Sequence, residues 1–368
     1  MTNGTTTAAD SRELAANDAK SGSKGHYLPV RAPRRGRARG PQAAWLLAAV
    51  VVLAAACAAS LAAGARGLSP DTVWRALTHF DPANGDHAVV HARIPRTILG
   101  LLAGGALGLA GAAMQGVARN PLADPGIIGV NAGAALAVVT GIYVFGVSSL
   151  TGYIWFAFLG AAGAAVVVYL IASMGRDGAT PVKLALAGAA LSAGLYSLMN
   201  VILVSSQDTL DRFRFWQVGG IAGRDWSVVL PGVPFLLAGA LIVLSAGRTL
   251  NGLALGDDIA RGLGQRVGLA RGVTALGIVL LCGSATALAG PIGFVGLVVP
   301  HAVRALTGPD YRWILPFSLV LAPALLLLSD VVGRVVLLPG EVPAGIMTAL
   351  VGAPFFVWLV RRGKRAGL

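Results

Sequence analysis

Residues able to carry out chemistry are few in this sequence, and their spacing forms no catalytic or nucleotide-binding motif. Lys20 precedes Ser21, but no glycine-rich phosphate-binding pattern comes before them. Three of the five histidines, His79, His87 and His91, fall in one predicted loop. We favour a solvated loop there over a metal site, because these histidines are not placed together on one predicted helix. We therefore expect no enzyme activity, no resident cofactor and no metal.

Charged side chains that could bind a partner lie at the ends of apolar runs. Arg93 and Arg96 open the second run, and Arg334 closes the ninth. All three are predicted to lie outside the membrane, against the usual excess of Lys and Arg on the inside, so something should compensate for them. The local alternatives are interfacial snorkelling for the first two and an i,i+4 pair with Asp330 for Arg334.

The composition indicates a polytopic membrane protein. Of the 368 residues, 55% are hydrophobic and 12% are charged, whereas a soluble domain carries about 25% charged residues. The 50 glycines are typical of membrane helices that approach closely. The net charge of +13 comes largely from clusters flanking the first and last apolar runs, which favours anionic lipid headgroups and excludes nucleic acid as a partner.

The hydrophobic pattern predicts an all-α fold with about ten transmembrane helices in a permease domain over residues 42–361. Residues 1–41 are predicted to be a disordered basic cytoplasmic tail, and residues 362–368 a cytoplasmic basic end. The eighth apolar run is too short to span the membrane unaided. The ten runs cover residues 42–64, 96–117, 126–146, 151–174, 181–204, 227–247, 270–289, 293–306, 313–337 and 343–360.

An even number of spans places both termini on one side, and the distribution of Lys and Arg predicts that this side is the cytoplasm. Two connections are long. The outer one, residues 205–226, has a central part that could form a short surface helix. The inner one, residues 248–271, has the periodicity of one or two short amphipathic helices.

Four motifs, in order, resemble the FecCD family of ABC importer permeases. They are the block 93–131 with Asn120-Pro121-Leu122-Ala123-Asp124-Pro125-Gly126, the segment 255–264, the segment 289–301 with Arg304, and Pro339-Gly340-Glu341-Val342-Pro343 leading to residues 352–356. The resemblance covers residues 66–361 and implies the type II ABC importer permease architecture. It also implies a homodimer or heterodimer in the bacterial inner membrane, with an ATPase dimer on the cytoplasmic side and a substrate-binding protein outside.

The resemblance implies that the inner loop 251–268 transmits closure of the ATPase. Small residues in this loop are expected to fit a narrow cleft of that partner, and the two acidic residues to favour a helix N-terminus. The alternative is an amphipathic helix lying on the headgroups. The residues expected to couple are Leu255, Gly256, Asp257, Asp258, Ala260, Leu263 and Gly264.

Binding-protein docking is likewise assigned by resemblance, to Arg93, Arg96 and Arg334, since arginines at matching positions of the similar cobalamin importer meet acidic residues of its binding protein. The translocation pathway is expected along the fifth span, where small and weakly polar residues suit a bulky solute; helix packing through small residues is the alternative. The pathway residues are Thr180, Gly188, Ser192, Ser197 and Asn200.

The predicted function is inward passage of an iron(III)–siderophore complex, powered by a separate ATPase. A cobalamin or haem importer of the same family is the alternative cargo assignment. An ion-coupled secondary transporter is the alternative of another class, and the near absence of mid-span acidic residues counts against it. A structural or sensory membrane subunit is a third possibility.

Overall fold

The computed structural model describes residues 39–174 and 180–365, and these residues are helical with no strand among them. The described residues from Gln42 onward belong to one compact unit. The predicted disordered tail, residues 1–41, lies outside the described ranges except for residues 39–41. Those three residues form the start of helix α2. The last helix continues to Arg365, beyond the predicted end of the tenth span.

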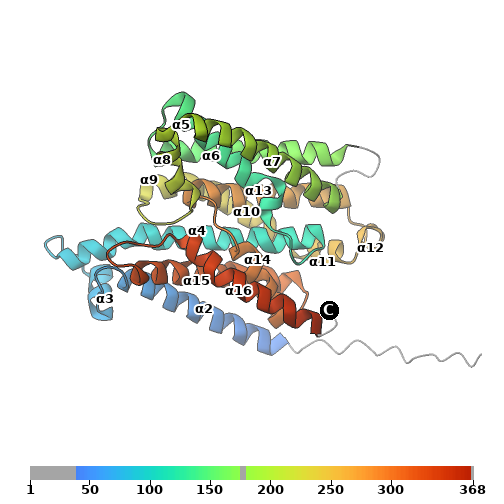
Figure 1. Cartoon of the computed structure of the whole chain (residues 1–368). Helices are drawn as coiled ribbons and strands as arrows, with labels where there is room; N and C mark the ends of the chain where they lie inside the picture. The colour runs from blue at the N-terminus through green and yellow to red at the C-terminus, as the bar shows by residue number, and fades with distance from the viewer. Residues whose placement is uncertain (1–38, 175–179, 366–368) are drawn as a thin grey trace, which may run out of the picture. The chain divides into compact units, whose positions relative to one another are not determined.

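Ten apolar helices within the described ranges confirm the predicted all-α membrane architecture, and Figure 1 shows how they are arranged. Seven are long enough to cross a membrane and three are shorter. The long ones are α2 (Arg39–Ala62), α4 (Gly85–Ala118), α6 (Leu150–Ser173), α7 (Pro181–Ser205), α9 to α10 (Trp226–Ser245), α13 (Val267–Ala289) and α15 (Tyr311–Val336). The shorter apolar segments are α5 (Val130–Phe145), α14 (Val295–Thr307) and residues Ala344–Trp358 of α16 (Ala344–Arg365).

Helix α4 begins earlier than the sequence predicted. Its N-cap Asn84 accepts a hydrogen bond from the Asp86 amide at 2.9 Å, and the helix then runs through Pro95. His87 and His91, predicted to lie in a loop, therefore stand four residues apart on α4. His87 Nδ1 accepts from the Asp81 amide at 3.0 Å. Within the described ranges no group of three or more potential ligands could hold a metal ion.

Helix α4 occupies the middle of the bundle and packs on α15, α13, α14 and α10. In its most apolar stretch 83% of the residues are buried, against 17% in α2 and in α7, which lie at the periphery. Glycines allow this position. A Cβ on Gly111 would lie 1.8 Å from the Gly296 carbonyl oxygen of α14, and one on Gly104 would lie 2.5 Å from the Pro323 Cα of α15. Such contacts between backbones hold membrane helices together where lipid is as apolar as the side chains.

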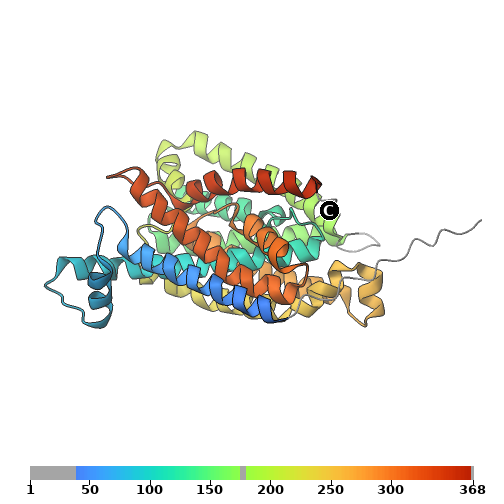
Figure 2. The same cartoon turned by 90° about the horizontal axis from the view of Figure 1, so that it is seen from below.

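Short helices gather at the two ends of the bundle, as both views show (Figures 1 and 2). Helices α3 (Pro70–Thr78) and α8 (Gln207–Gln217) lie at one end; α8 confirms the short helix predicted within residues 205–226. Helices α11 (Gly247–Ala254) and α12 (Asp257–Gly262) lie at the other end, where α16 also finishes. Two 3-10 turns, η1 (Pro125–Ile128) and η2 (Leu230–Gly232), complete the structure.

Replacing Gly111 by alanine should destabilise the fold, because the new methyl group would overlap the α14 backbone. Overpacking of this kind costs about 1–3 kcal/mol. The matched control is Gly163→Ala on α6, where nothing lies within 4 Å and alanine should be neutral or stabilising by about 0.5–1 kcal/mol. Thermal unfolding of both purified variants in detergent tests this; equal midpoints would contradict the close α4–α14 contact.

Candidate functional site

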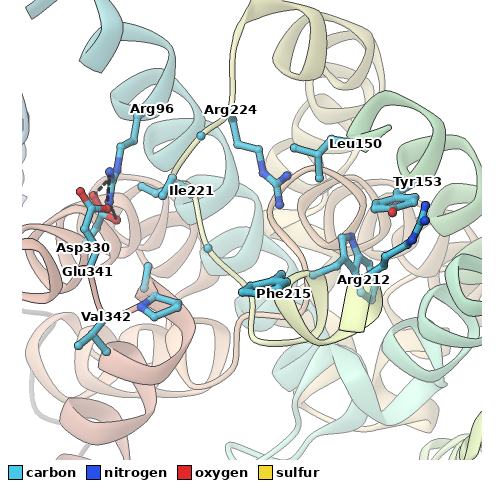
Figure 3. Close-up of a pocket in the computed structure, with 17 residues that line it drawn as sticks. Arg96, Leu150, Tyr153, Arg212, Phe215, Ile221, Arg224, Asp330, Glu341 and Val342 are labelled. Carbon is cyan, nitrogen blue, oxygen red and sulfur yellow. Dashed lines mark hydrogen bonds and ion pairs between the residues drawn. The ribbon is translucent and has the colours of Figure 1, made fainter. Parts of the chain in front are cut away.

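Four charged side chains meet at the end of the bundle that carries α3 and α8, and we call them the outer cluster: Arg96, Asp330, Arg334 and Glu341. The Asp330 carboxylate accepts from Arg96 Nε at 3.0 Å and Nη2 at 2.8 Å, and from Arg334 Nε at 2.9 Å. Arg96 Nη1 also lies 2.8 Å from Glu341 Oε2 (Figure 3). Two positive and two negative charges balance, as burial requires.

The outer cluster is joined to the C-terminal end of α2, whose last carbonyl groups have no partner within the helix. Arg334 Nη1 donates to the Ser60 carbonyl at 2.7 Å and the Ala63 carbonyl at 3.1 Å. Arg93 Nη1 donates to the Leu61 carbonyl at 2.8 Å and the Ala62 carbonyl at 3.0 Å. Positive side chains at a helix C-terminus also interact favourably with the helix dipole, so these two arginines fix α2 against α4 and α15.

This geometry changes the picture of the three arginines predicted to dock a binding protein. Arg334 is only 2% exposed, and its guanidinium forms the local pair with Asp330 that the i,i+4 spacing allowed. The Arg93 guanidinium caps α2 rather than snorkelling to headgroups. Burial of Arg334 leaves it no direct contact with an external partner in this structure. Glu341 was quoted in a sequence motif, but nothing in the sequence indicated its pairing with Arg96.

At the opposite end, three exposed apolar residues lie on and beside α12, and we call them the apolar ridge. Leu255 ends α11 just before Gly256, Ile259 lies on α12, and Leu263 caps the end of α12; they are 60%, 53% and 64% exposed. Ala260 faces the other way, with no exposed surface, and packs with Leu253 and Val267. The Ala260 side chain thus contacts the bundle in this structure, and its predicted fit into a cleft of the ATPase stays a prediction.

Two glycines of this loop adopt backbone conformations with positive φ. Gly256 has φ +111° directly before α12, and Gly264 has φ +79° directly after it, a region that side-chain-bearing residues rarely adopt. Asp258 is fully exposed and pairs with Arg261 within α12 at 3.0 Å.

A buried arginine anchors α12 to α13. Arg271 donates Nη1 to Asp257 Oδ2 at 3.0 Å and Nη2 to Asp257 Oδ1 at 2.7 Å, a two-bonded pair of the strong, directional kind. Arg119, which ends α4, places Nη1 3.8 Å from the same carboxylate. Asp257 was predicted from its position at a helix N-terminus; the sequence did not indicate Arg271 as its partner.

The predicted pathway residues of α7 divide into two groups. Thr180 caps the helix by accepting from the Lys183 amide at 3.4 Å, and Gly188 packs so closely on η1 that a Cβ would lie 1.8 Å from the Ile127 carbonyl oxygen. Ser192 is half-buried. Ser197 and Asn200 lie on the exposed face of α7, so only this pair is open to a solute or to another subunit.

Ten apolar helices, with ion pairs concentrated at the two ends, define a multi-pass membrane transport protein. The chain belongs to the FecCD transport family, which matches residues 51–362. It is 46% identical over 321 residues to the ferric enterobactin transport system permease protein FepD of Escherichia coli (strain K12), covering 86% of this chain and 95% of FepD.

Two further similarities support the same assignment. A siderophore transport system permease protein, YfiZ of Bacillus subtilis (strain 168), whose function is described as probable, is 42% identical over 320 residues, covering 87% of this chain and 96% of YfiZ. A metal-chelate type ABC transporter solved in an inward-facing conformation superposes with a TM-score of 0.76 at 31% identity, over 87% of this chain and 99% of that one. The predicted architecture of an ABC importer permease is thereby confirmed.

Changing Asp330 to Asn should destabilise the protein strongly, because it leaves Arg96 and Arg334 without their shared counter-charge. Removing one partner of a buried ion pair costs about 3–5 kcal/mol. Asp71→Asn is the control, since its pair with Arg75 on α3 is exposed and exposed pairs contribute at most about 1 kcal/mol. Chemical or thermal unfolding in detergent measures both; a small, equal loss would show that the outer cluster is dispensable.

Proposed function

We propose that this chain is the membrane subunit of an ATP-driven importer that carries an iron(III)–siderophore complex inward. The observation that carries the proposal is near full-length identity of 42–46% to permease proteins of siderophore transport systems. ATP is bound by a separate ATPase dimer, and the substrate arrives on an external binding protein. Cobalamin and haem are the alternative cargoes within the family.

The proposed orientation in the bacterial inner membrane has both termini in the cytoplasm. The basic clusters at residues 31–39 and 361–365 support it. Helices α11 and α12 lie at the same end of the bundle as the end of α16 (Figure 1), which puts them on the side where an ATPase would bind. The outer cluster then faces the binding protein.

The apolar ridge Leu255, Ile259 and Leu263 is the proposed contact with the ATPase. Three exposed apolar side chains on and beside α12 are unfavourable in water, and covering them by a partner would recover the free energy of burial. Asp258 and Arg261 on the exposed part of α12 add polar contacts at the margin. Gly256 and Gly264 keep α12 short, and Asp257 holds it to the bundle through Arg271.

At the outer end, the predicted docking arginines Arg93 and Arg96 are both partly exposed; the Arg96 side chain is 13% exposed and pairs with Glu341. In this proposal Arg93 and Arg334 act on docking indirectly, by fixing the ends of α2 and α15. The exposed face of α7 with Ser197 and Asn200 is the proposed wall of the pathway, completed by a second permease subunit.

The test of the proposed function is ATP-dependent uptake into right-side-out membrane vesicles. The vesicles carry the chain together with its ATPase and its binding protein. A panel of iron(III)–siderophore complexes, haem and cobalamin should show saturable import of one iron complex. Import that persists without ATP and follows an imposed proton or sodium gradient would instead support a secondary transporter, and import of cobalamin or haem alone would overturn the cargo assignment.

Changing Ile259 to Glu should uncouple transport, because it places a charge in the centre of the apolar ridge. Loss of one buried isoleucine, about 1.5–3 kcal/mol, corresponds to at least about tenfold weaker ATPase association. Leu77→Glu on α3 removes an exposed apolar residue at the opposite end and should leave ATPase association unchanged. Co-purification of the ATPase and vesicle uptake measure this. Parental uptake by a normally inserted Ile259→Glu variant would rule out the ridge as the coupling surface.

A further inference from the structure

A cavity of about 320 Å³ lies beside the outer cluster (Figure 3). Its walls come from α4, the start of α6, α8 and the loops that precede α9 and α16. Three arginines and three aromatic residues line it: Arg96, Arg212, Arg224, Tyr153, Phe215 and Trp216. The volume lies near the lower end of the range for small-molecule sites, about 300–1,000 Å³.

Within the described residues, two of the three arginines around the cavity are paired with carboxylates, and the third, Arg224, is not. Arg96 is neutralised by Asp330 and Glu341, and Arg212 pairs with Asp208 at 3.0 Å. Arg224 has neither an ion pair nor a hydrogen bond to the described residues, and its Nε is buried without an acceptor. Figure 3 shows its side chain extending between Arg96 on one side and Arg212 with Tyr153 on the other.

The acidic residue next to Arg224 in the chain is engaged elsewhere. Asp225 Oδ1 accepts from the Val228 amide at 3.2 Å and from Ser227 Oγ at 2.7 Å, which makes it the N-cap of α9. The hydrogen bond from Ser227 lowers the pKa of this carboxyl group, so it stays ionised at its cap. The loop is also fixed at its start, where the Gly220 amide donates to the Ala289 carbonyl at 2.7 Å.

A partly buried cation without a counter-charge carries an unrecovered desolvation cost. Burial lowers the pKa of Arg224, but a guanidinium stays protonated in proteins, so the charge cannot be removed by deprotonation. A second donor beside the cavity, Trp216 Nε1, is also buried without an acceptor. Both features are those of a site that lacks an anionic ligand with acceptor oxygens.

We propose that Arg224 and this cavity form a binding site for a carboxylate group of the transported chelate, occupied as the cargo enters the membrane subunit. The inference rests on the proposed function for the source of the ligand. The cavity holds one arm of a chelate rather than the whole complex. Its lining favours a small organic anion over an aspartate or glutamate of the binding protein, because Tyr153, Phe215 and Trp216 add apolar ring surface to it that suits a carbon skeleton.

The test uses the full chain in lipid nanodiscs, with citrate as the anionic probe and its uncharged trimethyl ester as the chemical control. Calorimetry should show citrate binding that the ester lacks. Arg224→Gln should weaken citrate binding about tenfold or more, the effect of losing a hydrogen-bonded charge. Arg75→Gln, which removes an exposed arginine at the same end, should leave it unchanged. Equal citrate binding by wild type and Arg224→Gln, or none by wild type, would overturn the site.

Thermal stability separates a ligand site from a structural role. Because Arg224 has no partner among the described residues, Arg224→Met should raise the unfolding midpoint without ligand and abolish the upward shift that citrate gives the wild type. A lower midpoint, or loss of binding-protein association in Arg224→Gln with no citrate binding by wild type, would assign Arg224 to structure or to protein docking. Vesicle uptake tests the proposed function separately: citrate binding without import of any iron complex would refute the iron-complex cargo and leave the anion site standing.

Discussion

Close backbone contact along α4 is the constraint on which the rest of this structure depends. In a lipid bilayer there is no hydrophobic driving force between helices, because the lipid tails are as apolar as the side chains. Association of the helices therefore relies on close packing and on polar contacts. Glycines at positions 104 and 111 let α4 touch α15 and α14 directly. Around this helix the other spans take their places, and the least buried of them, α2 and α7, are left at the margin.

Polar interactions are concentrated where the packed centre meets water. At one end the outer cluster satisfies both its own charges and the free carbonyls of α2, so a helix with little packing of its own is held by arginines from α4 and α15. At the other end Asp257 and Arg271 hold α12. The two ends therefore combine fixed internal ion pairs with surfaces left open: the cavity at Arg224 and the apolar ridge at α12.

Much of the fold could be predicted from the sequence, because membrane spans are local patterns of about 20 apolar residues and their order is the order of the chain. The two inner helices and the outer helix α8 were also predictable from local periodicity. The start of α4 was not, since Pro95 is a common helix boundary and only the Asn84 cap shows that the helix begins before it.

The candidate sites were predictable in position but not in orientation. Whether Ala260 faces a partner or the bundle depends on Leu253 and Val267, and the partner of Arg96 is Asp330, 234 residues away. Such pairings follow from three-dimensional packing that one sequence does not encode in any local pattern. Arg224 was passed over for the same reason: it stands out only because the carboxylates around it are all occupied.

The bond between Asp257 and Arg271 has a mechanical consequence. A surface loop that receives a push normally absorbs it by bending at its hinges, and α12 has glycines at both ends that would allow this. The two parallel hydrogen bonds bypass those hinges and connect α12 directly to α13, which packs on α4, α6 and α10. If an ATPase displaces α12 as proposed, this six-residue helix would pass the displacement through the Asp257–Arg271 pair into the centre of the bundle.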